Sequence, residues 1–194
     1  MIIKRRIIDF ITSLNLPNAI TIGRIILVPI IIWCISIDEF LISFILFSIA
    51  GISDFIDGWL ARLHKLQTVL GAWLDPVADK LLMGSVYLTL GLLGHLPLWL
   101  VSVVILRDVF IIGMVVLAKF QNKLAGIKPL MVSKINTVAQ ITLAILVLAD
   151  LSFTTNLMAW REPIYLLVGA TTLISTFAYL SAWVKITYIN KPFN

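Results

Sequence analysis

The chain has 194 residues and a formal net charge of +5, with 60% hydrophobic residues and only 13% charged ones. Soluble domains are closer to half apolar and about a quarter charged. The apolar excess is too large for one buried core, which excludes an ordinary soluble domain and favours an integral membrane protein. In that class, surplus Lys and Arg residues mark topology, so no nucleic-acid partner is expected.

Residues 1–16 are expected to form an amphipathic helix at the membrane interface. Lys4, Arg5 and Arg6 stand among isoleucines there, and such a segment buries its apolar face while its cations reach anionic headgroups. The segment has no small-residue cleavage site of a secretory signal. It also lacks the Arg- and Ser-rich, acid-poor composition of an organelle transit peptide. These features favour a bacterial protein of the inner (cytoplasmic) membrane.

Six apolar segments follow, each near the roughly 20 residues that a helix needs to cross a bilayer. They run approximately over 18–37, 40–63, 70–94, 97–120, 130–150 and 163–188. The breaks between them fall at Asp38-Glu39 and in the stretches HKLQT, GHLP, QNKLAGIKP and WREP. No repeat or long linker divides the chain, so a single membrane domain over 1–194 is expected.

The distribution of basic residues predicts the topology. With the N-terminus in the cytoplasm, only Arg161 falls on the outer side, and the outer loops are otherwise acidic. The basic residues at the cytoplasmic side are then Lys4, Arg5, Arg6, Arg62, Lys65, Lys119, Lys123, Lys128, Lys134, Lys185 and Lys191. Those that remain within spans are Arg24, Lys80 and Arg107. This positive-inside pattern predicts an all-α protein with six transmembrane helices and both termini in the cytoplasm.

The stretch SDFIDGWLARLHKLQTVLGAWLDPVADK, residues 53–80, places aspartates inside otherwise apolar predicted helices. Asp54 and Asp57 are three residues apart and share one helix face, and Asp75 and Asp79 are four apart and share another. Both pairs fall near the cytoplasmic ends of their spans. Two adjacent antiparallel helices would therefore bring the four carboxylates together at a similar depth.

Four carboxylates at that depth need neutralising partners. One charge at the bilayer centre costs about 3 kcal/mol or more, and crowded like charges raise this cost. Divalent cations are the simplest partners, because hard cations take carboxylate oxygens. The four residues could hold two ions, or one ion with a carboxylate left as a base.

Small residues and a cation accompany the aspartates. Gly58 and Ala61 lie on the aspartate side of their helix, and Gly71 stands one turn before Asp75, which leaves space for a ligand. Arg62 suits a phosphate oxygen. Because paired metals stabilise in-line displacement at phosphorus, the set indicates a phosphate-bearing substrate.

The pattern D-x2-D-G-x2-A-R-x8-G-x3-D-x3-D, from Asp54 to Asp79, resembles the signature of the CDP-alcohol phosphotransferase (class I phosphatidyltransferase) family. All fixed positions are present. The resemblance covers the whole chain, since six spans after an N-terminal interfacial helix are also the family pattern. It implies transfer of a phosphatidyl group from CDP-diacylglycerol to an alcohol with release of CMP, in a homodimer.

The resemblance also implies residue roles. It makes Asp79 the general base that deprotonates the acceptor hydroxyl. The residues implied to hold two divalent cations, Mg or Mn, are Asp54, Asp57, Asp75 and Asp79. The residues implied to contact the CDP moiety are Asp54, Gly58, Ala61, Arg62 and Gly71.

The acceptor alcohol is less closely defined. Residues 15–29, NLPNAITIGRIILVP, resemble the first span of phosphatidylglycerophosphate synthases and of CMP-forming cardiolipin synthases. Arg107, Lys128 and Lys134 could bind an acceptor phosphate. Two other interpretations stay open: Arg107 forms a structural pair with Asp108, and Lys128 only marks topology.

Two acceptors are weighed. The run KP…SKxNTxxQ, with Arg-Asp in the fourth span, favours phosphatidylglycerol and hence a cardiolipin synthase. The short and apparently bacterial chain favours glycerol 3-phosphate, which gives phosphatidylglycerophosphate, and this acceptor is preferred.

A small ion transporter is the remote alternative, because intramembrane aspartates also line ion pathways. A transport path would place polar groups through the full depth of the spans, whereas the acids here gather near one interface. It would also leave the offsets of the glycines and of Arg62 unexplained.

Overall fold

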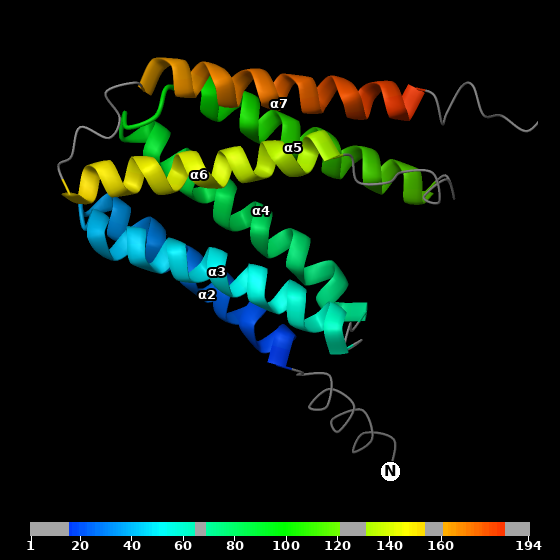
Figure 1. The fold of residues 1–194 in the computed structure, drawn as a ribbon, viewed down its shortest axis with the longest axis horizontal. Helices are drawn as coiled ribbons and strands as arrows, with labels where there is room; N and C mark the ends of the chain where they lie inside the picture. Colours follow the sequence, from blue (N-terminus) through cyan, green and yellow to red (C-terminus); the bar gives the residue numbers. More distant parts are fainter. Residues whose placement is uncertain (1–15, 65–68, 121–130, 154–160, 185–194) are drawn as a thin grey trace, which may run out of the picture. The chain divides into compact units, whose positions relative to one another are not determined.

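The computed structural model of the chain describes residues 16–64, 69–120, 131–153 and 161–184. They form six α-helices with short turns, and none of these residues lies in a strand. The helices are α2 (Leu16–Ser36), α3 (Phe40–His64), α4 (Val69–Leu92), α5 (Leu98–Phe120), α6 (Met131–Phe153) and α7 (Arg161–Val184) (Figure 1). The all-α prediction is confirmed for this part of the chain. Residues 1–15 of the predicted interfacial helix lie outside the described residues.

The helices divide into two compact units. The first comprises Met1–Thr89 with Leu151–Thr154, and the second comprises Leu90–Asp150 with Thr155–Asn194. The first thus contains α2, α3 and most of α4, whereas the second contains the end of α4, α5, most of α6, and α7. Because α4 and α6 both cross the boundary, the division does not test the prediction of a single membrane domain.

Helices α2 and α4 both end in a Schellman turn. After α2, Asp38 has a φ of 63°, and the N–H of Glu39 donates to the carbonyl of Cys34 over 2.9 Å. After α4, Gly94 has a φ of 80°, and the N–H of the next residue donates to the carbonyl of Leu90 over 2.8 Å. Glycine adopts this left-handed conformation without strain and aspartate tolerates it. Both turns fall at breaks predicted from the sequence.

In the first unit, α2 and α3 pack side by side (Figure 1). Ile31 and Ile35 of α2 and Phe47 and Ala50 of α3 are all buried. The turn between the two helices is only three residues long, so they form a hairpin. The beginning of α2 therefore lies along the later part of α3, where the aspartate motif starts.

In the second unit, α5 packs against α7, and two glycines permit close approach. A Cβ at Gly169 of α7 would lie 2.7 Å from Cζ3 of Trp99 on α5. A Cβ at Gly91, at the end of α4, would lie 2.7 Å from Cγ2 of Val101. Since real Cβ contacts are longer, both helix contacts depend on a missing side chain.

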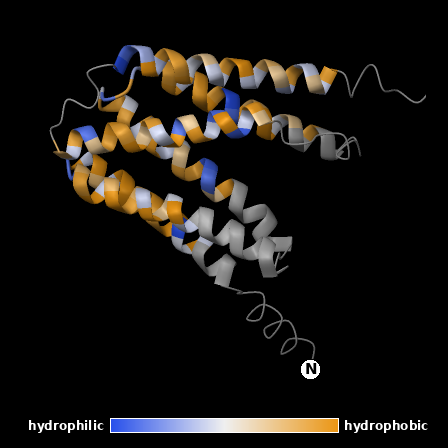
Figure 2. Ribbon diagram, in the orientation of Figure 1, coloured by the Kyte–Doolittle hydropathy of each residue, from blue (hydrophilic) through white to orange (hydrophobic). Residues whose placement is uncertain are grey.

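The described helices expose apolar side chains and bury polar ones. Figure 2 shows hydrophobic residues along most of each helix. Trp33 is 67% exposed and Leu92 is 72% exposed, and many other large apolar side chains of these helices are exposed as well. The buried polar or charged residues are Thr21, Arg24, Ser43, Arg107, Asp108, Asn136, Gln140, Thr172 and Ser175. Exposed large apolar side chains in this number suit contact with lipid.

The length and composition of each helix indicate whether it could cross a membrane. Over the described residues, α6 and α7 are each long and apolar enough to cross a membrane. Six spans and the side of each terminus stay predictions.

Candidate active site

The aspartate motif lies on two helices of the first unit. The last three turns of α3 carry Asp54, Asp57, Gly58, Ala61 and Arg62. The first three turns of α4 carry Gly71, Asp75 and Asp79. These positions agree with the predicted second and third segments. The roles of the residues stay predictions, and Asp79 is the one motif residue whose side chain the structure describes.

Asp79 forms an ion pair with an arginine from outside the motif. Nη1 of Arg24, on α2, donates to Oδ1 of Asp79 over 2.6 Å. The Arg24 side chain is 2% exposed and that of Asp79 is 43% exposed. Arginine stays protonated in proteins, so this contact provides a permanent positive charge against the proposed base. Arg24 was predicted as a cation within a span, and its contact with Asp79 was not predicted.

A pocket of about 290 Å³ lies beside Arg24, between α2 and α3. Its lining residues are Gly23, Arg24, Leu27, Ala50 and Ser53. Most of this lining is apolar, and Ser53 directly precedes Asp54. Arg24 therefore borders both the pocket and the carboxylate of Asp79.

The donor set of the motif fits divalent metal ions. It offers only carboxylate oxygens, which are the ligands that Mg²⁺ and Mn²⁺ prefer. The residues come from two helices of the same compact unit. Among the side chains that the structure describes, no three potential ligands gather at one point. Asp54, Asp57 and Asp75 are not among those side chains, so the metal site itself stays a prediction.

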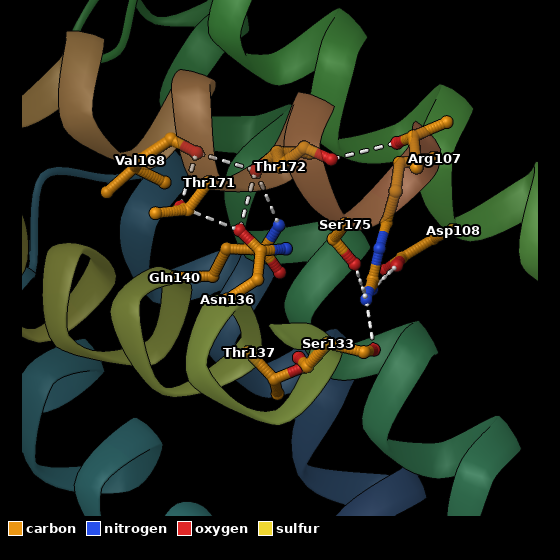
Figure 3. Close-up of polar contacts among 11 residues, drawn as sticks. Arg107, Asp108, Ser133, Asn136, Thr137, Gln140, Val168, Thr171, Thr172 and Ser175 are labelled. Carbon is orange, nitrogen blue, oxygen red and sulfur yellow. Dashed lines mark hydrogen bonds and ion pairs between the residues drawn. The ribbon is translucent and has the colours of Figure 1, made fainter. Parts of the chain in front are cut away.

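A second buried arginine lies in the second unit. Arg107 of α5 is 2% exposed, and its Nη1 donates to Oδ1 of Asp108 over 2.6 Å. Nη2 donates to the hydroxyls of Ser133 on α6 and Ser175 on α7 (Figure 3). Its Nε has no hydrogen-bond partner among the described residues. The Arg107–Asp108 pair is therefore real, and the guanidinium connects three helices.

The joint role of the predicted acceptor-binding cations, Arg107, Lys128 and Lys134, stays a prediction. Lys134 is exposed on α6, next to Ser133, and Lys128 lies outside the described residues. Arg107 is the one member of the predicted set whose buried surroundings are described.

A polar network between α6 and α7 was not predicted. Asn136 Oδ1 accepts from the hydroxyls of Thr171 and Thr172, over 3.0 and 2.9 Å. Gln140 Nε2 donates to the Thr172 hydroxyl over 3.3 Å (Figure 3). Asn136, Gln140 and Thr172 are at most 1% exposed. The only sequence signal was the spacing of Asn136 and Gln140, one helical turn apart. The network fixes the helices that carry Ser133 and Ser175.

The comparison with protein families identifies the class. Residues 14–186 match the model of the protein family described as "CDP-alcohol phosphatidyltransferase". The chain belongs to the CDP-alcohol phosphatidyltransferase family. This confirms the resemblance seen in the aspartate motif, and the apolar exterior agrees with the membrane-embedded character of the family.

Individual relatives within the family carry two kinds of name, glycerol-3-phosphate 3-phosphatidyltransferase and CMP-forming cardiolipin synthase. A chloroplastic CDP-diacylglycerol--glycerol-3-phosphate 3-phosphatidyltransferase of Oryza sativa is 35% identical over 184 residues, covering 86% of this chain and 56% of the relative. A probable CMP-forming cardiolipin synthase of Drosophila melanogaster is 31% identical over 190 residues, covering 86% and 57%. A CDP-diacylglycerol--glycerol-3-phosphate 3-phosphatidyltransferase of Rickettsia felis is 46% identical over 79 residues, covering 39% and 44%. The chain thus spans little more than half the length of the first two.

The prediction of a bacterial inner membrane is wrong. Relatives that align over most of the chain include a chloroplastic protein of rice and a protein of the fly, whereas the Rickettsia felis match covers 39% of the chain. Bacterial and organellar bilayers impose similar span lengths, so apolar segments and basic loops do not separate them. The composition of residues 1–16 was no guide either, because the chain covers only part of the length of these relatives.

Proposed function

We propose that the protein transfers the phosphatidyl group of CDP-diacylglycerol to an alcohol and releases CMP. The observation that carries this proposal is the complete aspartate motif on α3 and α4 of one compact unit. The family match over residues 14–186 supports it. The reaction forms a bond between the acceptor oxygen and the phosphorus next to diacylglycerol, and it breaks the bond from that phosphorus to CMP.

In this mechanism, the four aspartates hold two divalent cations, which supply positive charge to the diphosphate when bound. A carboxylate oxygen of Asp79 takes the proton of the acceptor hydroxyl. Arg62 binds a phosphate oxygen of the donor. Gly58, Ala61 and Gly71 leave room for the CDP moiety.

Glycerol 3-phosphate is the proposed acceptor, and phosphatidylglycerol is the second candidate. In the first case Arg107, Lys128 and Lys134 bind the acceptor phosphate, and the buried Arg107 Nε offers a donor that lacks a partner among the described residues. The names of the rice and Rickettsia relatives support this acceptor. The name of the fly relative supports phosphatidylglycerol. The Arg107–Asp108 contact is compatible with both.

The proposed arrangement in the bilayer has six spans, with both termini on the side that carries the aspartate motif. The apolar exterior of the described helices supports it. A homodimer is proposed on the family resemblance alone.

The test is CMP release by the purified protein in detergent, with CDP-diacylglycerol, Mg²⁺ or Mn²⁺, and each acceptor offered separately. Release with glycerol 3-phosphate alone would support the first acceptor, and release with phosphatidylglycerol alone would support the second. Release with neither, while a known family enzyme is active in the same assay, would contradict the proposal. Asp79→Asn serves as the inactive control.

A further inference from the structure

Arg24 lies outside the sequence motif, yet it contacts the motif residue with the proposed catalytic role. The two residues are 55 positions apart, on α2 and α4 of the same unit. Their 2.6 Å contact is a charge-assisted hydrogen bond, which is stronger and more directional than a neutral one. The contact therefore fixes the place of one carboxylate oxygen relative to α2.

The two side chains of this ion pair differ strongly in burial, which indicates which of them holds the other in place. The Arg24 side chain is only 2% exposed, whereas the Asp79 carboxylate is 43% exposed and accessible to ligands. A buried arginine is costly unless it is paired. Arg24 is a buried, permanently charged hydrogen-bond donor, so it can hold the accessible carboxylate of Asp79 in place.

The same charge acts on any cation that binds beside Asp79. A guanidinium in contact with a metal-binding carboxylate lowers the negative potential that attracts a divalent ion. Removing it should strengthen metal binding, although it should also release the carboxylate from its fixed position. A residue with a purely structural role would not give these opposite effects.

We propose that Arg24 is a positioning residue for Asp79: its guanidinium holds the Asp79 carboxylate in the position of a base. The positive charge of Arg24 at the same time weakens the binding of divalent cations at the aspartate motif. The inference rests on the proposed function, since it takes Asp79 as both ligand and base. It assigns a role to a helix that contributes nothing to the aspartate motif.

The experiment measures two quantities on the full chain in detergent. Mn²⁺ binding to metal-free protein is followed by electron paramagnetic resonance, without substrates, and kcat for CMP release is measured at saturating Mn²⁺. For Arg24→Gln, we expect the Mn²⁺ dissociation constant to fall by roughly three- to thirtyfold. We expect kcat to fall by about tenfold to a hundredfold. Weaker or unchanged Mn²⁺ binding, or an unchanged kcat, would overturn the proposal.

Arg24→Lys keeps the charge and loses the planar guanidinium. Its Mn²⁺ dissociation constant should stay within about twofold of the wild type, while kcat stays reduced. A wild-type kcat would contradict positioning by the guanidinium. This variant also carries the test if Arg24→Gln does not fold.

Arg107→Gln is the matched control, because it removes an equally buried guanidinium whose partners are Asp108, Ser133 and Ser175. It should leave Mn²⁺ binding unchanged, and a shift equal to that of Arg24→Gln would refute a specific role for Arg24. If the wild type binds Mn²⁺ but releases no CMP, the proposed function fails, and the binding measurements still decide the electrostatic part of this inference.

Discussion

Two arginines are buried in the part of the chain that the structure describes, and both form ion pairs of 2.6 Å, with different surroundings. Arg24, in the first unit, reaches a carboxylate 55 residues away that is 43% exposed. Arg107, in the second unit, pairs with its neighbour Asp108, whose side chain is 12% exposed, and also binds two serines. The exposed carboxylate of the first pair can contact a ligand while Arg24 holds it, whereas Arg107 is enclosed and its serine contacts join α5 to α6 and α7. The first should therefore matter most for activity and the second most for stability.

Asp79→Asn should give the largest effect of all on activity. The amide cannot take a proton, so CMP release should fall by about 100-fold or more. Its side-chain oxygen still accepts from Arg24 and position 79 is 43% exposed, so the thermal unfolding midpoint in detergent should fall less than in Arg107→Leu, although the buried guanidinium loses its counterion. Rates and unfolding curves measured on the same preparation check both points. An active variant, or one destabilised as much as Arg107→Leu, would remove the contrast between the two pairs.

Arg107→Leu should give the largest loss of stability, since it leaves Asp108 buried without its cation. Removing one partner of a buried pair costs about 3 to 5 kcal/mol. Replacing Asp108 by Leu as well should restore part of that loss. The measurement is a double-mutant cycle on the unfolding free energy in detergent. Additive effects of the two substitutions would show that the pair does not couple them.

Gly169→Ala tests whether the network around Arg107 depends on close contact between α5 and α7. The new methyl group would meet the Trp99 ring, so a loss of about 1 to 3 kcal/mol in unfolding free energy is expected. Gly113→Ala is the control on α5, because its Cβ would meet nothing within 4 Å. That change should be neutral or stabilising by up to about 1 kcal/mol. Equal effects of both substitutions would show that the contact is unimportant.

Gln140→Leu should have the smallest effect. It removes one long hydrogen bond to Thr172, and interhelical hydrogen bonds in membrane proteins contribute about 0.6 kcal/mol on average. The unfolding free energy is again the measurement. A loss as large as that of Arg107→Leu would mean that the α6–α7 network, and not the arginine, holds the second unit together.

The sequence predicted the helices well, because each apolar segment is long and ends at a recognisable break. At the ends of α2 and α4 and at the starts of α3 and α5, where the structure describes the residues on both sides, the predicted and observed bounds differ by at most two residues. The aspartate motif was placed on the correct two helices, because its spacing fits one helix face on each.

The contacts between distant residues were not predictable in the same way. The pairing of Arg24 with Asp79 depends on how α2 and α4 are rotated and tilted, and apolar segments do not encode those angles. The network of Asn136 and Thr172 depends on the same kind of information. The membrane that holds the protein was predicted wrongly, since hydropathy reports a bilayer and not its compartment.

The position of Arg24 has a consequence for how variants of this protein are judged. The aspartate signature begins at Asp54, 30 residues after Arg24. A natural variant with another residue at position 24 would keep the whole signature, yet it would lack the ion pair at Asp79. A survey of substitutions that inspects only the signature would class such a protein as intact. The residues in contact around Asp79 therefore extend beyond the sequence signature and include Arg24 on α2.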